Sequence, residues 1–215
     1  MTIVATEATL EIENTVGSAL PITALTQANP GVATSASHGL TNGDFVRLSV
    51  TSGMVELDGQ VARVANVDTN TFELEGIDTT NFSAWESGGG SAYEVSGWYS
   101  FSSATDVDLG NASPTELDGS KLINRSTITL YGRGGAKSGT ISMHHEPHNS
   151  AVQKLRSLAT STNIAFRLTW SDGSLCCFGA KTAYSGGFTA NNNSIVTGSC
   201  PITIQGEHGV AEYAS

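Results

Sequence analysis

The chain has 215 residues and a formal net charge of −10 at pH 7, and it lacks the basic patch that would mark a nucleic-acid-binding domain. No run approaches the roughly 20 apolar residues of a membrane helix, so no membrane partner is expected. An apolar content of 39 % can fill a core, and 24 glycines among clusters of Ser, Thr and Asn are typical of many short strands joined by turns.

The first part of the chain predicts strands alone. Leu10 and Ile12 alternate with glutamates, which is typical of a half-exposed strand. Residues 21–91 hold short β-rich pieces, and each piece ends at a turn signal such as Asn-Gly or Asp-Gly. This segment has eight acidic residues against two arginines, and the triple glycine at 88–90 predicts a linker at its exit.

The middle of the chain predicts strands, a long loop and one helix. Residues 92–103 predict an apolar-rich strand, and residues 103–125 predict a long polar loop. Residues 127–132 and 139–144 predict a pair of strands joined by a flexible, glycine-rich connection.

The single predicted helix follows this strand pair. Ser150 fits the N-cap position, and Gln153 three residues later completes a capping box. The helix is expected to end near residues 160–163. One side of it carries an apolar stripe of Val152, Leu155 and Leu158.

The last third of the chain has the clearest β pattern. Residues 163–170 and 175–184 predict a hairpin around a Ser-Asp-Gly-Ser turn. The alternation in the first of these strands places Trp170 in the core. The final strand has one apolar face, made of Val196, Cys200, Ile202 and Ile204.

Three of the five histidines lie together as His144, His145 and His148. Zinc sites need ligands that converge, whereas neighbouring residues of a strand point to opposite sides. The spacing fits no zinc motif, so the histidines are interpreted as a strand-to-helix junction and no metal is predicted.

The remaining reactive residues predict no catalysis. Cys176, Cys177 and Cys200 are an odd number, so we expect reduced, buried thiols in a protein made in a cytoplasm. His38 and Asp44 fit turn chemistry. No nucleophile elbow or phosphate loop occurs, so the sequence predicts neither an enzyme nor a cofactor.

Five segments in a fixed order carry a family likeness: "SPTELDGSKL", "GTISMHHEP", "SAVQKLRSL", "AFRLTWSDGSLCCFGA" and "SIVTGSCPITIQG". In this order they resemble the tail tube (major tail) proteins of non-contractile tailed bacteriophages. The likeness covers residues 1–20 and 92–215. Residues 21–91, with "ANPGVATSASHGLTNGDFVRL" and "GIDTTNFSAWESGG", look like a small β-domain that is found inserted in phage virion proteins.

The resemblance implies a mainly β fold, a tail-tube β-sandwich or barrel with one flanking α-helix, plus the inserted small all-β domain on the tube exterior. It implies self-assembly into stacked hexameric rings, a tail tube through which phage DNA is delivered. The implied partners are further copies of the chain, the tape measure protein and genomic DNA in the lumen, and tail-tip and terminator proteins at the ends. The implied location is the virion tail, after synthesis in the host bacterial cytoplasm.

Four acids are candidates for the assembly loop or the bore of such a tube: Asp106, Asp108, Glu116 and Asp118. An acidic bore would repel DNA phosphates, and solvated loop charge is the alternative. Two other functions stay open. One is the inner tube of a contractile injection machine with the same fold; the other is a carbohydrate-binding β-module with Trp85, Trp98 or Trp170 as its stacking platform.

Overall fold

The computed structural model describes residues 8–110, 114–118, 129–134, 137–158, 162–206 and 209–214. This part of the chain is mainly β with one α-helix, which confirms the predicted fold class. The elements are β1 Thr9–Ile22, β2 Ala24–Leu25, β3 Gly31–Thr34, β4 Phe45–Val50, the 3-10 helix η1 Val55–Leu57, β5 Val61–Ala65, β6 Thr71–Leu74, β7 Gly90–Ser100, β8 Ala104–Asp108, β9 Pro114–Asp118, β10 Thr129–Gly134, β11 Ser138–His144, α1 Ser150–Ser157, β12 Asn163–Thr169, β13 Leu175–Thr182, β14 Thr197–Ile204 and β15 Ala211–Tyr213.

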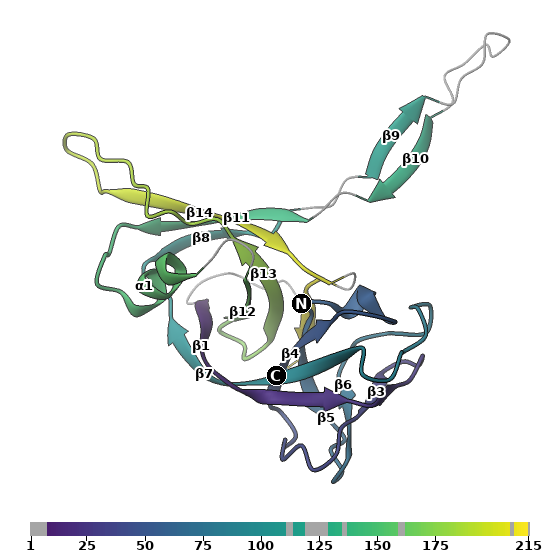
Figure 1. The fold of residues 1–215 in the computed structure, drawn as a ribbon. Coiled ribbons are helices and arrows are strands. Elements are labelled where there is room, and N and C mark those ends of the chain that lie inside the picture. The colour runs from purple at the N-terminus through teal and green to yellow at the C-terminus, as the bar shows by residue number, and fades with distance from the viewer. Residues whose placement is uncertain are drawn as a thin grey trace, which may run out of the picture.

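Most strands belong to one continuous sheet. Its order is β2-β3-β6-β5-β4-β7-β1-β12-β13-β14-β11-β8, and β15 joins it beside β13 to make a 13-stranded sheet. Strand β8 ends this path, so one of its sides has no strand neighbour in the described part of the chain. β9 and β10 form a separate two-stranded sheet, the β9–β10 arm, which projects from the body (Figure 1).

The long antiparallel strands β1 and β7 connect the two halves of the body (Figure 1). Their register extends from Glu11 opposite Ser100 to Ile22 opposite Gly90. β2 continues β1 after a single residue and pairs with β3, so the path through β6, β5, β4 and β7 returns to β1 and closes a small barrel. Apolar side chains fill this barrel, among them Leu48, Met54, Phe72 and Leu74.

The other half of the sheet curls around a second core, and α1 packs into it. Ala151, Val152 and Leu155 of α1 are buried there with Phe166 and Phe178, whose rings stack 5.2 Å apart. The apolar side of α1 is therefore confirmed. The predicted face of the final strand is confirmed in the same core for Cys200, Ile202 and Ile204.

The small barrel and the curled sheet meet over a third apolar cluster. It joins Phe45 and Val61 of the barrel to Cys177 and Tyr213 of the curled sheet. The Tyr213 hydroxyl accepts a hydrogen bond from the backbone N–H of Arg63 at 2.8 Å, and the Arg63 guanidinium lies 4.5 Å from the centre of the Tyr213 ring. Packed side chains thus hold the two halves together.

Glu13 adds a buried ionic link across the same junction. It lies on the shared strand β1 and is only 4 % exposed. Its Oε2 accepts from Arg47 Nε of β4 at 3.1 Å and from the Ala165 N–H of β12 at 2.9 Å. Nearby, the Gln60 side chain makes two 3.1 Å hydrogen bonds with the backbone of Gly209. Both polar links fix the orientation of the small barrel.

The predicted ends of the helix are wrong. Asn149, not Ser150, is the N-cap, because its Oδ1 accepts from the Ala151 N–H at 2.9 Å. The helix ends at Ser157, earlier than the sequence suggested. An Asn side chain caps as well as Ser does, and the pattern alone did not separate the two neighbours.

The predicted pairing of residues 127–132 with 139–144 is also wrong. β10 pairs with β9 in the arm, whereas β11 pairs with β14 on one side and β8 on the other. The predicted polar loop 103–125 contains β8 and β9, while residues 111–113 and 119–125 lie outside the described residues.

The glycines at 88–90 are not a linker. Gly89 lies in a tight turn, where its carbonyl accepts from the Thr51 N–H at 2.7 Å, and Gly90 opens β7. A Cβ at Gly90 would stand 3.0 Å from Val50 Cα, so close backbone packing requires glycine there. Trp170, which the alternation placed in the core, is half-buried, and Val196 lies just before β14 rather than in it.

Replacing Arg47 by methionine should destabilise the fold strongly. Arg47→Met leaves the buried Glu13 carboxylate with one N–H partner, and an uncompensated buried charge costs about 3–5 kcal/mol. The matched control, Arg156→Met on the exposed side of α1, should change the free energy of unfolding by about 0.5 kcal/mol or less. Urea unfolding followed by circular dichroism measures both, and equal losses would contradict the role given to Glu13.

Candidate functional site

The histidine-rich junction between β11 and α1 contacts the loop between β13 and β14. His144 ends β11, and His145 and His148 lie in the connection that follows. The His145 ring packs 4.4 Å from the ring of Phe188. Within the described residues, no group of three or more His, Cys, Asp and Glu side chains is placed to hold a metal ion.

His38 and Asp44 fix turns, as the sequence predicted. Nδ1 of His38 accepts from the Leu40 N–H at 3.1 Å, and its Nε2 lies 2.9 Å from the carbonyl oxygen of Asp68. These two contacts define a neutral imidazole with its hydrogen on Nε2. The Asp44 carboxylate accepts from the Thr41 N–H at 2.7 Å.

The three cysteines are buried and free, which confirms their predicted place in the core. Burial raises the pKa of Cys176, Cys177 and Cys200 to about 12 each. A thiol with so high a pKa carries almost no thiolate at neutral pH, so none of the three is an activated nucleophile.

All three tryptophans are half-buried. Trp98 is half-buried between the Arg167 guanidinium, 4.6 Å from its ring centre, and Phe45, whose ring centre is 5.7 Å away. Trp85 packs against the core of the small barrel. Trp170 is half-buried beside the end of β12.

The most distinctive exposed surface is the outward face of the last three strands of the sheet, which we call the β8–β11–β14 face. Residues directly opposite each other on antiparallel strands share a face. The alternation turns Ile141 and Cys200 inward to the core. The outward positions carry mostly short polar side chains, among them Asp106, Asp108, Thr140, Ser142, Ser199 and Pro201, and His144 at the end of β11. The three strands contain no lysine or arginine.

The four candidate acids fall into two places. Asp106 and Asp108 are exposed on β8, within the β8–β11–β14 face, and Asp108 also accepts from the Gly110 N–H at 2.8 Å. Glu116 and Asp118 are exposed on β9 in the arm. The sequence suggested one continuous loop for all four, whereas the sheet topology divides them between body and arm.

These features define a class of protein. Strand β8 has an open side among the described residues, and the unpaired N–H and C=O groups of an edge strand are a template for a strand of another chain. The arm adds a second strand pair outside the body (Figure 1). The geometry is that of a mainly β protein whose described part leaves a sheet edge open to a strand of another chain.

The family match is more specific. Residues 52–213 match the family described as "Phage tail tube protein, TTP". The match covers most of the chain, and the chain therefore belongs to the phage tail tube protein family. It is a structural component of bacteriophage tails, a virion protein that self-assembles into a tube with other tail components.

A second similarity is short. Ubiquitin-like modifier-activating enzyme 1 is 42 % identical to this chain in Homo sapiens and 39 % in Mus musculus, each over 72 residues. The match takes in 32 % of this chain and only 7 % of each enzyme, so it does not bear on activity. Separately, no helix in the described part of the chain has the length and hydropathy to cross a membrane.

The free energy of unfolding should decrease as the pH rises above about 8.5. Thiols of the unfolded chain ionise near that pH, whereas the pKa of each thiol in the folded chain is about 12. Between these values the folded state holds more protons, so stability falls with rising pH. Urea unfolding at several alkaline pH values measures the slope, and Cys200→Ala should reduce it. A flat profile would contradict the buried neutral thiols.

Proposed function

We propose that copies of this chain form hexameric rings, that the rings stack into the tail tube, and that phage DNA is delivered through its lumen. The open side of β8 carries this proposal, with support from the arm. A ring that joins copies through such edges removes them, as a closed barrel does.

Asp106 and Asp108, on the β8 part of the β8–β11–β14 face, are our candidates for the lining of the bore. Their carboxylates would repel DNA phosphates, and the three strands contain no lysine or arginine that would bind a phosphate strongly. Such a surface would let the genome slide. Glu116 and Asp118 are assigned to assembly, because the arm stands away from this face.

Residues 21–91 are proposed to be the inserted domain on the tube exterior, with residues 1–20 and 92–215 in the wall. The small barrel has its own core and lies at the opposite end of the strand path from β8. Its acidic excess suits an exposed surface. The contacts of Glu13 and Gln60 would hold it in one orientation.

The proposed partners follow from a tube of this kind. The lumen would hold the tape measure protein and then genomic DNA, and tail-tip and terminator proteins would close the ends. Free, buried cysteines support synthesis in the reducing cytoplasm of a host bacterium.

Electron microscopy and DNA ejection test the tube and its bore together. The purified parent chain should form stacked rings when concentrated. Subunits with Asp106→Lys and Asp108→Lys should also assemble, but DNA ejection from virions that carry them should slow at least about tenfold, because lysines bind phosphates. Glu86→Lys with Glu212→Lys makes the same change of charge outside the β8–β11–β14 face and should leave ejection unchanged.

The tube and the bore assignment can be refuted separately by this experiment. A parent chain that stays monomeric under all conditions and is absent from virions would refute the tube. Normal ejection by the Asp106→Lys, Asp108→Lys tubes would leave the tube intact and refute the bore assignment.

A further inference from the structure

The connection between β13 and β14 exposes apolar side chains to solvent. The large apolar side chains that stand exposed in the described chain are Val55, Phe188 and Ile195, at 52 %, 58 % and 67 % of their surface. Phe188 and Ile195 share this one connection, residues 183–196, which extends beyond the ends of the strands (Figure 1). We call it the 183–196 loop. Two exposed apolar side chains on one loop mark a contact surface more often than one isolated side chain does.

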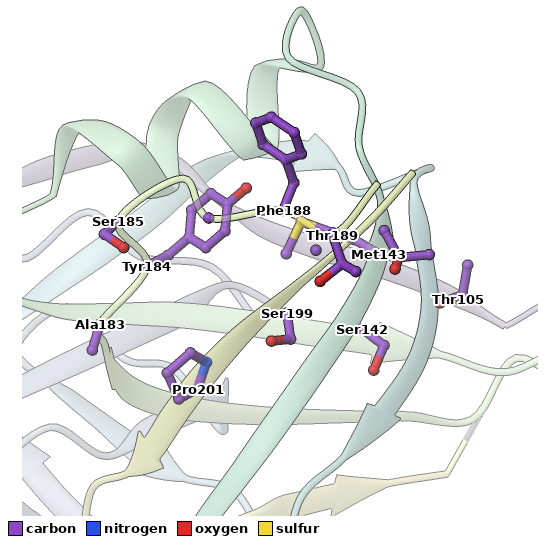
Figure 2. Close-up of a pocket in the computed structure, with 13 residues that line it drawn as sticks. Thr105, Ser142, Met143, Ala183, Tyr184, Ser185, Phe188, Thr189, Ser199 and Pro201 are labelled. Atoms are coloured by element: carbon purple, nitrogen blue, oxygen red, sulfur yellow. The ribbon is translucent and has the colours of Figure 1, made fainter. Parts of the chain in front are cut away.

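A hollow lies between this loop and the sheet. It has a volume of about 730 Å³, and Ser142, Ser199 and Pro201 form its floor, while Tyr184 and Phe188 come from the loop (Figure 2). The hollow therefore begins on the β8–β11–β14 face and is covered by the 183–196 loop. It combines hydroxyl groups with aromatic surface.

Buried polar atoms beside the hollow lack partners within the described chain. Tyr184 is 7 % exposed, and its hydroxyl makes no hydrogen bond there. Nδ1 of His145, whose ring packs on Phe188, is likewise buried without a partner. A buried polar group without a partner costs free energy, so both groups would gain from a segment that enters the hollow.

The β9–β10 arm lacks a surface to pack on within its own chain, as far as the described residues show. Its two strands pair only with each other in the described chain, and an isolated two-stranded sheet is marginally stable in water. The arm needs a surface to pack on. Figure 1 shows it projecting away from the body of its own chain.

The arm and the hollow lie at opposite ends of the same strand pair. The arm leads into β11 at Ser138, where Lys137 accepts a hydrogen bond from Ile204 of β14. The hollow adjoins the other end, where His144 pairs with Thr197. β11 has 7 residues, so about 20 Å separates its first residue from its last, and the arm projects away from the body at the Ser138 end (Figure 1).

We propose that the β9–β10 arm of one copy seats on the 183–196 loop and its hollow in the next copy. A donor surface at one end of a subunit and its acceptor at the other make a head-to-tail contact, which closes rings or extends stacks. The inference rests on the proposed self-assembly and adds the acceptor: Phe188 and Ile195 as apolar anchors, Tyr184 and His145 as hydrogen-bonding groups.

Removal of the two anchors tests the acceptor. Phe188→Ser with Ile195→Ser should raise the concentration needed for tube formation at least about tenfold, because two apolar side chains no longer become buried. The variant should remain a folded monomer by circular dichroism, since both side chains are exposed in the free chain. Val55→Ser, which removes the exposed apolar side chain of the small barrel, is the matched control and should assemble normally.

The outcomes separate the two proposals. Parent tubes together with normal assembly of the Phe188→Ser, Ile195→Ser variant would overturn the acceptor and leave the tube intact. A parent chain that never assembles would overturn both. Equal loss in Val55→Ser would also overturn the acceptor, because the effect would no longer be specific to the loop.

Cross-linking between different copies tests the contact itself. One batch carries Glu116→Cys on the arm and another carries Thr189→Cys on the loop; the native thiols are buried, with pKa values raised to about 12, and stay unreactive. Mixed tubes treated with a short bismaleimide should yield covalent dimers, and tubes of either batch alone should not. Tubes that mix Glu116→Cys with Val55→Cys should yield none. Dimers with Val55→Cys, or none with Thr189→Cys, would overturn the proposal.

Discussion

The buried carboxylate of Glu13 is the interaction on which the shape of the body depends. It lies on β1, the strand that both halves share, and takes one hydrogen bond from Arg47 of the small barrel and one from the Ala165 N–H of the curled sheet. Moving either half away would leave a buried charge with too few partners, at a cost of several kcal/mol. The two halves therefore behave as one body, although each has its own apolar core.

A rigid body places its incomplete surfaces at fixed positions. The open side of β8, the β9–β10 arm and the 183–196 loop all belong to the curled sheet or extend from it, while the small barrel lies at the far end of the strand path. A tube subunit needs this division, because its contact surfaces must face neighbours while its other side meets solvent. In the account proposed here, the curled sheet makes the wall and the small barrel decorates it.

The sequence predicted the parts of the fold that depend on local patterns. The hairpin of β12 and β13 is confirmed because strict alternation and a Ser-Asp-Gly-Ser turn specify it within one short stretch. β8 and β9 were missed because "ATDVD" and "PTELD" are short and polar and resemble a loop. The pairing of β10 with β9 instead of β11 is a long-range choice that sequence proximity cannot reveal.

The candidate site, too, depends on long-range contacts that sequence proximity does not reveal. Asp106 and Glu116 were grouped because they are close in sequence, and only the sheet topology places one on the body and the other on the arm. The acceptor surface escaped sequence reasoning because it combines Ser142 of β11 with Tyr184 and Phe188 of a loop some forty residues later. The nearest sequence signal was the histidine-rich junction, whose His145 packs on Phe188.

A cryo-electron microscopy reconstruction of assembled tubes, at a resolution that traces the strands, tests the central claim most directly. The account predicts six copies in each ring, the β8–β11–β14 face toward the lumen, and the small barrel outside. A bore lined by the small barrel, or rings in which the open side of β8 meets only solvent, would contradict it.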